Sequence, residues 1–193
     1  MLWYASTKSA PSLLKRVRNK IIKKSTITLV AGNLFLGVSA LQAAPVTQGH
    51  AEGNLVVKGK AIAITQAYAY METDTFDASK QMTVLLLCNA SLDAAAVRDQ
   101  FEKVRNELVD AGKLSCVQQR IDSGKHVINF GVRDKGFGAR QPDGGSTEHV
   151  FEVTTLNGKA IAGRAHTKSP QMSFDDVPYS YDITFSAAIE PGH

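Results

Sequence analysis

The sequence has few of the residues, and none of the motifs, from which most catalytic centres are recognised. It contains two cysteines, five histidines and one tryptophan in 193 residues. No Gly-x-Ser-x-Gly elbow, His-Glu-x-x-His pair, Walker loop or dinucleotide fingerprint is present. Zinc and iron–sulfur sites need cysteines or histidines clustered at short spacings, and these are also missing. We therefore predict no metal and no cofactor.

Acidic residues are absent from the first 44 positions. A basic run over 15–24 precedes a mostly apolar run over 27–41, and the small residues Ala43 and Ala44 follow, which is the layout of a secretory signal. The apolar run falls short of the roughly 20 residues that cross a bilayer, so no stable membrane anchor is expected after cleavage. We predict a signal peptide over 1–44, cut after Ala43 or Ala44, and a periplasmic or secreted protein. A mitochondrial presequence, an over-extended gene start and an uncleaved signal anchor stay open as alternatives.

The basic excess of the chain belongs to this leader. Seven of the 22 Lys and Arg residues lie before residue 45, so removing the leader changes the net charge from +4 to −3. The only tryptophan, Trp3, is removed with it. A nucleic-acid partner needs a basic face that displaces counterions, so we predict that the mature protein has no nucleic-acid partner.

Cys88 and Cys116 are the only cysteines. In an oxidising compartment, two cysteines in one small domain usually form a structural disulfide. If 82–88 and 114–121 were parallel neighbours joined by a helix, the cysteines would lie about 20 Å apart. A disulfide spans only about 7 Å between Cα atoms. The bridge and the parallel crossover therefore exclude each other, and we predict the bridge; two buried, unpaired thiols are the alternative.

Apolar and alternating runs predict a domain built mostly of strands. Three turn signals each separate two strand-like runs, which predicts three hairpins. Residues 82–88 (MTVLLLC) are typical of a buried strand, and 179–190 alternates as a half-buried antiparallel strand does. We expect a single β-rich domain over 54–193 behind a flexible lead-in over 45–53. The turn signals are Lys58-Gly59, Asp122-Ser-Gly124 and Asn157-Gly158.

One helix is predicted, over about 92–110. Val97, Phe101, Val104 and Leu108 recur at helical spacing and form an apolar stripe typical of core packing. The expected fold class is therefore α+β, with a mostly antiparallel or sandwich-like sheet. The single amphipathic helix would lie across the end or face of that sheet.

The stretch 133–147 (RDKGFGARQPDGGST) is a long loop rich in glycine and basic residues. Loops of this length are either functional or mobile. Its basic residues could receive an anionic group, although no phosphate-loop spacing is present. Tyr68 and Tyr70 sit two apart in a predicted strand and so share a face, which we expect to be exposed. The candidate contact residues are Arg133, Lys135, Phe137, Arg140, Tyr68 and Tyr70.

The leading hypothesis is an exported, non-enzymatic binding domain for an unknown protein or a small anionic ligand. This hypothesis rests on two features of the sequence. No group of residues typical of a catalytic site is recognised, and a long, charged loop is present. Two alternatives belong to other classes. One is a small periplasmic hydrolase that uses His126 or His149 with a nearby carboxylate. The other is an envelope structural or assembly subunit that joins partners through the edge of its sheet.

Short segments at the two ends of the mature chain carry a resemblance. They are Gly53-Asn-Leu-Val-Val-Lys-Gly-Lys with Ala67-Tyr-Ala-Tyr70, and Tyr181-Asp-Ile-Thr-Phe-Ser-Ala187. In these the sequence resembles a loose set of uncharacterised exported bacterial proteins, in which a similar hairpin and last strand bracket the mature domain. The resemblance implies export and a β-rich domain. It implies no activity and no site residues.

Overall fold

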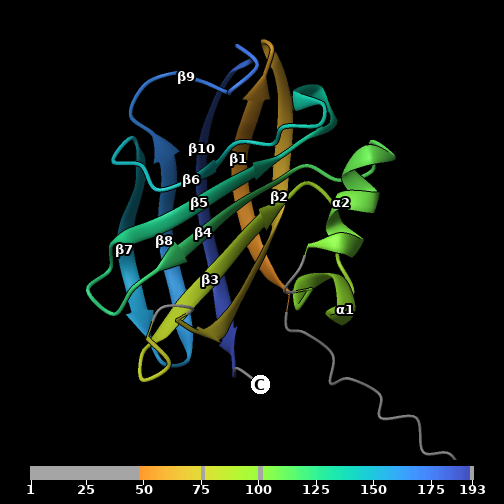
Figure 1. The fold of residues 1–193 in the computed structure, drawn as a ribbon. Coiled ribbons are helices and arrows are strands. Elements are labelled where there is room, and N and C mark those ends of the chain that lie inside the picture. The colour runs from red at the N-terminus through yellow and green to blue at the C-terminus, as the bar shows by residue number, and fades with distance from the viewer. Residues whose placement is uncertain (1–47, 75–76, 100–101, 192–193) are drawn as a thin grey trace, which may run out of the picture. The chain divides into compact units, whose positions relative to one another are not determined.

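The structure is a computed structural model that describes residues 48–74, 77–99 and 102–191. The signal peptide predicted over 1–44 lies outside these residues. A ten-stranded sheet dominates, with strand order β6-β5-β4-β3-β2-β1-β10-β8-β7 and with β9 paired to β10. The sheet curves into a half-barrel (Figure 1). The strands are β1 (Gly49–Val57), β2 (Lys60–Thr73), β3 (Gln81–Cys88), β4 (Cys116–Ile121), β5 (Val127–Arg133), β6 (Asp143–Gly144), β7 (His149–Asn157), β8 (Ala160–Thr167), β9 (Gln171–Met172) and β10 (Pro178–Glu190).

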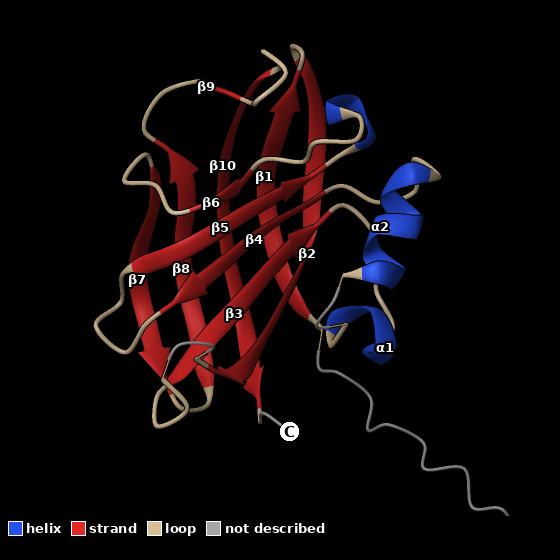
Figure 2. Ribbon diagram, in the orientation of Figure 1, coloured by secondary structure: helices blue, strands red, loops and turns tan. Residues whose placement is uncertain are grey.

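Neighbouring strands pair antiparallel, apart from a short parallel contact between the ends of β2 and β10. The three predicted hairpins are β1–β2, β4–β5 and β7–β8, and all are confirmed. Strand β10 alternates buried and exposed residues as its sequence predicted. Helices α1 (Ala94–Val97) and α2 (Lys103–Asp110) and the 3-10 turn η1 (Lys135–Phe137) complete the fold (Figure 2). The predicted fold class, a mostly antiparallel sheet with little helix, is confirmed.

Strand β3 is buried on both faces because two separate cores meet there. Leu85 and Leu87 point into the half-barrel, among side chains of β1, β4, β5 and β10. Val84, Leu86 and Cys88 point outward and pack under the helices with Val97 and Val109. Figure 1 shows both helices on that side of the sheet, beside β2, β3 and β4. Apolar residues therefore occupy every position after Gln81 except Thr83, instead of alternating.

The single helix predicted over 92–110 is wrong. Two short helices occupy the segment, and Glu102 between them has a left-handed φ of 58°. Asp99 supplies the cause: its carbonyl accepts from Glu102 N and its carboxylate accepts from Val104 N. Such a local side-chain bond competes with continuous helix. Within the predicted stripe, Phe101 lies outside the described residues, and Val104 is 38% exposed. Arg105 and Val109 are the buried residues of α2.

The flexible lead-in predicted over 45–53 is also wrong in its second half, because β1 begins at Gly49. Two glycines let β1 approach β10 closely. A Cβ at Gly53 would lie 2.1 Å from Asp182 O, and one at Gly49 would lie 2.3 Å from Ser186 O. Backbone pairing on both sides of β1 therefore fixes this segment, in which Ala51 is buried between the exposed His50 and Glu52.

Cys88 and Cys116 form a disulfide, as predicted. They are direct partners in the antiparallel β3–β4 ladder, with Cα atoms 4.2 Å apart. The helices therefore connect two antiparallel neighbours, and the parallel crossover is absent from this part of the sheet. Disulfides persist in oxidising compartments, so this one indicates an extracytoplasmic location. None of the helices in the described part of the chain has the length and apolar character needed to span a bilayer.

Candidate functional site

The predicted contact loop, from Arg133 onward, is held in one conformation by its own hydrogen bonds. The Asp134 carboxylate accepts from Gly136 N and from the Ser115 hydroxyl, both at 2.7 Å. The Gln141 side chain accepts from Asp134 N at 2.9 Å and donates to Gly138 O at 2.7 Å. Strand β6 then returns the loop to β5. The loop is therefore a preformed wall.

This wall borders an open groove of about 1090 Å³, which we call the α2 groove. It is lined by Asn106, Val109 and Asp110 of α2, by the loop over 133–143, and by Phe174. Phe174 is 71% exposed, and nearby Met172 is 58% exposed. A smaller pocket of about 140 Å³ adjoins the groove and shares Asp143 and Phe174 with it.

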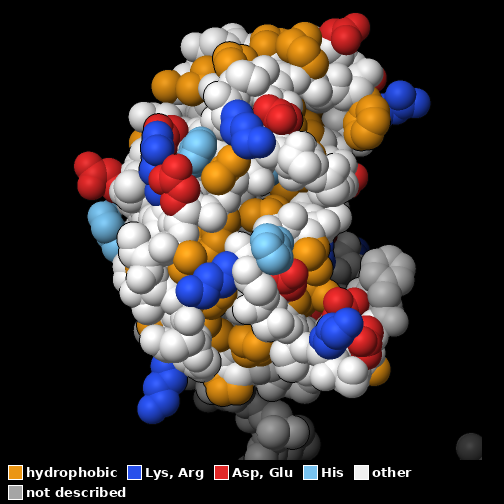
Figure 3. Space-filling view, turned by 90° about the vertical axis from the view of Figure 1, so that its left-hand side faces the viewer, with side chains coloured by type: hydrophobic (Ala, Val, Ile, Leu, Met, Phe, Trp, Pro, Cys, Tyr) orange, Lys and Arg blue, Asp and Glu red, His pale blue; other side chains and the backbone are white. Residues whose placement is uncertain are grey.

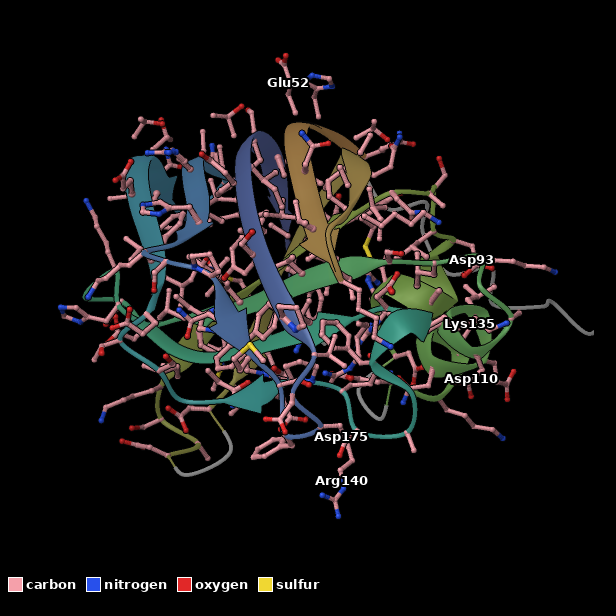
Figure 4. All side chains as sticks on the ribbon, turned by 90° about the horizontal axis from the view of Figure 1, so that it is seen from above. Glu52, Asp93, Asp110, Lys135, Arg140 and Asp175 are labelled. Carbon is pink, nitrogen blue, oxygen red and sulfur yellow. A yellow bond between two sulfur atoms is a disulfide. The ribbon has the colours of Figure 1, made fainter. Side chains whose placement is uncertain are left out.

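The charges around the α2 groove have both signs. Arg133 is largely neutralised, because it donates to Glu102 at 2.8 and 3.0 Å and has Asp143 at 3.5 Å. Lys135 and Asp110 lie together near η1 and α2, and Arg140 lies beside Asp175 at the outer rim (Figure 4). The exposed Arg140–Asp175 pair is long, at 3.9 Å. An incoming group with either sign of charge therefore finds a counter-charge.

Three of the six predicted contact residues line this groove, and three do not. Arg133, Lys135 and Arg140 line it. Tyr68 and Tyr70 are buried, so the expectation that they are exposed is wrong; the Tyr68 hydroxyl accepts from Leu92 N beneath the helices. Phe137 is buried against Tyr179, with ring centroids 5.4 Å apart.

Sequence reasoning missed the apolar members of the site. Phe174 and Met172 lie in a segment that reads as a Ser- and Pro-containing loop between two strands. Two polar members, Asn106 and Asp110, were missed as well, because the predicted helix that contains them was interpreted as core packing alone. Exposure of a single aromatic residue leaves no periodic signal, so nothing in the sequence marked Phe174.

His149 belongs to a buried polar cluster inside the half-barrel. Its ring stacks on Phe130 with centroids 3.5 Å apart. Gln119 donates to the Tyr181 hydroxyl, which lies 2.7 Å from His149 Nδ1 and can donate to it. His149 Nε2 then faces the Tyr179 hydroxyl at 3.3 Å. Burial lowers the pKa of His149 to about 4, so the ring is neutral at pH 7. Its contacts are aromatic and hydroxyl groups, with no carboxylate among them.

His126 lies in a different setting, in the β4–β5 turn. The side chain is 78% exposed, and its Nδ1 is 3.2 Å from Asp122 Oδ2. Asp122 also accepts from His126 N, which closes the turn. The pair therefore has a structural task, and no other titratable side chain is hydrogen-bonded to it in the described part of the chain.

Neither a metal site nor a relative adds to this picture. Within the described ranges, no group of three or more His, Cys, Asp and Glu residues is placed to hold a metal ion. No family model matches the chain, and no curated protein and no solved structure matches it.

Proposed function

We propose that this chain is an exported, non-enzymatic binding domain, periplasmic or secreted, whose α2 groove holds an extended segment of a partner polypeptide. The exposed Phe174 beside a preformed groove carries this proposal. A large aromatic side chain that is mostly exposed to water contributes little to the stability of the fold. Exposed apolar residues at the rim of a groove commonly mark an interaction site.

The residue types around the groove suit a polypeptide better than a small molecule or nucleic acid. Aromatic residues, Met and Arg are enriched at protein interfaces, and Phe174, Met172 and Arg140 stand together here. The groove is open along its length and offers both signs of charge. A nucleic acid would need a predominantly basic surface, which the expected net charge of −3 after leader removal does not provide.

The small pocket next to the groove, which has aromatic side chains in its walls, suggests how a partner is anchored. Its walls include Phe130, Met172, Phe174 and Tyr179. At about 140 Å³ it is close to the volume, roughly 150 Å³, of an engineered cavity that binds benzene. One leucine-sized or aromatic side chain of the partner would fit there. Anchors of this kind dominate binding energy at interfaces.

The order of the loop supports the same proposal energetically. Association normally costs free energy for the loops and side chains that must be ordered. The hydrogen bonds of Asp134 and Gln141 already fix the wall of the groove. Little of that cost therefore remains to be met when a partner segment arrives.

A random 12-residue peptide library displayed on phage tests the proposal directly. We expect selection on the exported protein to enrich peptides with an apolar anchor residue. Phe174→Ala should weaken a selected peptide by about tenfold or more, the loss typical of an interface anchor. Ile128→Ala is the matched control, because Ile128 is also an exposed apolar residue but does not line the groove. Equal binding by wild type and Phe174→Ala would contradict the proposal, as would failure to enrich any peptide.

A further inference from the structure

A second cleft also borders η1. It has a volume of about 490 Å³, and we call it the lysine cleft. Lys58 and Lys60 of the β1–β2 turn and Lys135 of η1 line it together. Val57, Ile62 and Leu114 add apolar wall. Two segments far apart in the sequence therefore bring three cations to one cavity.

The lining of the lysine cleft has a positive excess that the fold does not neutralise. All three lysine side chains are exposed, and none takes part in an ion pair within the described residues. Asp134 is the only carboxylate on the lining. Its two oxygens already accept hydrogen bonds from Gly136 N and the Ser115 hydroxyl. The lysines repel one another, so an anion placed among them relieves that repulsion.

The backbone at Lys58 has a conformation that is unusual for lysine. Val57 pairs with Lys60, so the turn has two residues, Lys58 and Gly59, with φ of 52° and 75°. Both values are positive, as in a type I′ turn, where Asn, Asp or Gly is preferred at the first position. A lysine in the left-handed region costs conformational energy there. Strained residues of this kind are often found at functional sites.

Gly136 brings η1 close enough to complete the cleft. A Cβ at this position would lie 3.0 Å from Val57 Cγ1 and 2.7 Å from Asp134 Oδ1. A side chain at this position would force the Asp134 carboxylate and the Val57 side chain to shift, and both of these residues line the cleft.

We propose that the lysine cleft binds a phosphate monoester of a small organic molecule. Lysine ammonium groups act as point charges and commonly bind phosphate. Three cations suit a dianion, which a phosphate monoester is above its second pKa of about 6. The volume falls within the roughly 300–1,000 Å³ typical of small-molecule sites. The apolar wall leaves room for an organic group beside the phosphate.

This inference is independent of the proposed peptide groove. Lys58 and Lys60 do not line the α2 groove, and Phe174 does not line the lysine cleft. Lys135 lines both, so a phosphate-bearing ligand bound in the cleft would neutralise a cation on the groove.

Isothermal titration calorimetry of the exported protein with phenyl phosphate tests the inference. Inorganic phosphate and phosphatidylcholine vesicles containing phosphatidic acid are the other two probes, and they separate a free anion and a lipid headgroup from a soluble ester. We expect phenyl phosphate to bind most tightly, and its affinity to fall as salt is raised. Preference for inorganic phosphate or for the vesicles would overturn the assignment of the ligand. Absence of binding by all three probes would overturn the site.

The chain supplies a matched pair of variants for the same titration. Lys60 and Lys159 occupy the same position in two copies of the pentapeptide Gly-Lys-Ala-Ile-Ala, and both follow a hairpin glycine. We expect Lys60→Gln to weaken phenyl phosphate about tenfold, the effect of losing one close charge contact, and Lys159→Gln to leave its affinity unchanged. Equal affinities for the two variants would refute the proposal.

Lys58→Asn shows whether a weaker affinity for phenyl phosphate comes from loss of the lysine or from unfolding of the protein. Asparagine suits the left-handed position, so this variant should melt at a higher temperature than wild type while binding phenyl phosphate more weakly. Phe174→Ala should bind phenyl phosphate as wild type does, and Lys58→Asn should bind the selected peptide as wild type does. The two proposals can therefore be tested separately, and one can fail while the other is still tested. A more stable Lys58→Asn with full phosphate affinity would contradict a functional role for Lys58.

Discussion

The two halves of the sheet are stabilised in different ways. Strands β2, β3 and β4 carry helices on their outer face, so their side chains are buried on both sides and include the disulfide. Strands β7, β8 and β10 bury only their inner face. Their outer face carries charged side chains of both signs close together (Figure 3). Both proposed binding sites border the covered half, where hydrogen bonds of Asp134 and Gln141 hold the loop over 133–143. The rigid segments of the protein, and the binding sites that depend on them, therefore lie beside the strands that are buried on both faces.

The largest expected effect comes from breaking the disulfide in the covered half. Replacing Cys88 and Cys116 by alanine should lower the free energy of unfolding by about 3–4 kcal/mol, because the unfolded chain gains the freedom that the bridge removes. Urea denaturation with and without reductant measures the loss. The alanine variant itself should not respond to reductant. A loss below about 1 kcal/mol, against the roughly 3–4 expected, would show that the covered half does not depend on the bridge.

Arg105 is expected to make the next largest contribution to the free energy of unfolding, because its side chain links α1, α2 and β4. It is almost fully buried and donates to Ala96 O at 2.7 Å and to Val97 O at 3.0 Å. Arg105→Ala leaves these carbonyls at the end of α1 without their partner, so we expect a loss of about 2–3 kcal/mol. Lys103→Ala, on the exposed side of α2, is the control and should change the urea midpoint little. Similar effects for the two variants would contradict the structural role of Arg105.

His149 lies where the two halves meet, packed on Phe130 of β5, and it makes stability depend on pH. Its pKa is lowered from an ordinary value of 6.5 to about 4 by burial. The unfolded state therefore binds more protons between these values, and stability falls as the pH falls from 6.5 to 4. The loss should reach about 2–3 kcal/mol at pH 4. His149→Gln should flatten this part of the profile in urea titrations at stepped pH. An unchanged slope in the variant would assign the pH dependence to another group.

The smallest expected effect lies on the bare outer face. Arg164 makes a two-pronged contact with Asp182, with both hydrogen bonds at 2.7 Å, and this contact lowers the pKa of the Asp182 carboxyl. The pair is exposed, and such pairs contribute little because water and salt screen them. Asp182→Asn should shift the urea midpoint less than the disulfide variant, Arg105→Ala or His149→Gln, and 1 M salt should remove the difference. A shift as large as that of Arg105→Ala would erase the contrast between the halves.

Much of the fold is readable from the sequence because periodicity reports burial. The alternation in β10 and the apolar run of β3 identified both strands, and the turn residues identified the hairpins. The disulfide was predicted from two cysteines in one small exported domain, and the distance argument then excluded the parallel crossover. The break between α1 and α2 did not follow, because it depends on which of several polar residues bonds the backbone. A side chain such as that of Asp99 gives no periodic signal.

The candidate site was readable only in part, for a related reason. Lys135 and Arg140 were found because a long basic loop is unusual in itself. Tyr68 and Tyr70 share a face as predicted, but the sequence does not show that the helices cover it. Arg133 is neutralised by Glu102, which is 31 residues away. Pairings over such distances depend on tertiary structure, as does the exposure of Phe174.

Amide hydrogen exchange with and without a selected peptide tests the central claim most directly. If the α2 groove binds the peptide, protection should appear at 138–143 and 171–175, on its two walls. The edge strand β7 should exchange at its original rate. Protection along 149–157 with none at the groove would contradict the account, because it would show that the chain joins its partners through the edge of its sheet.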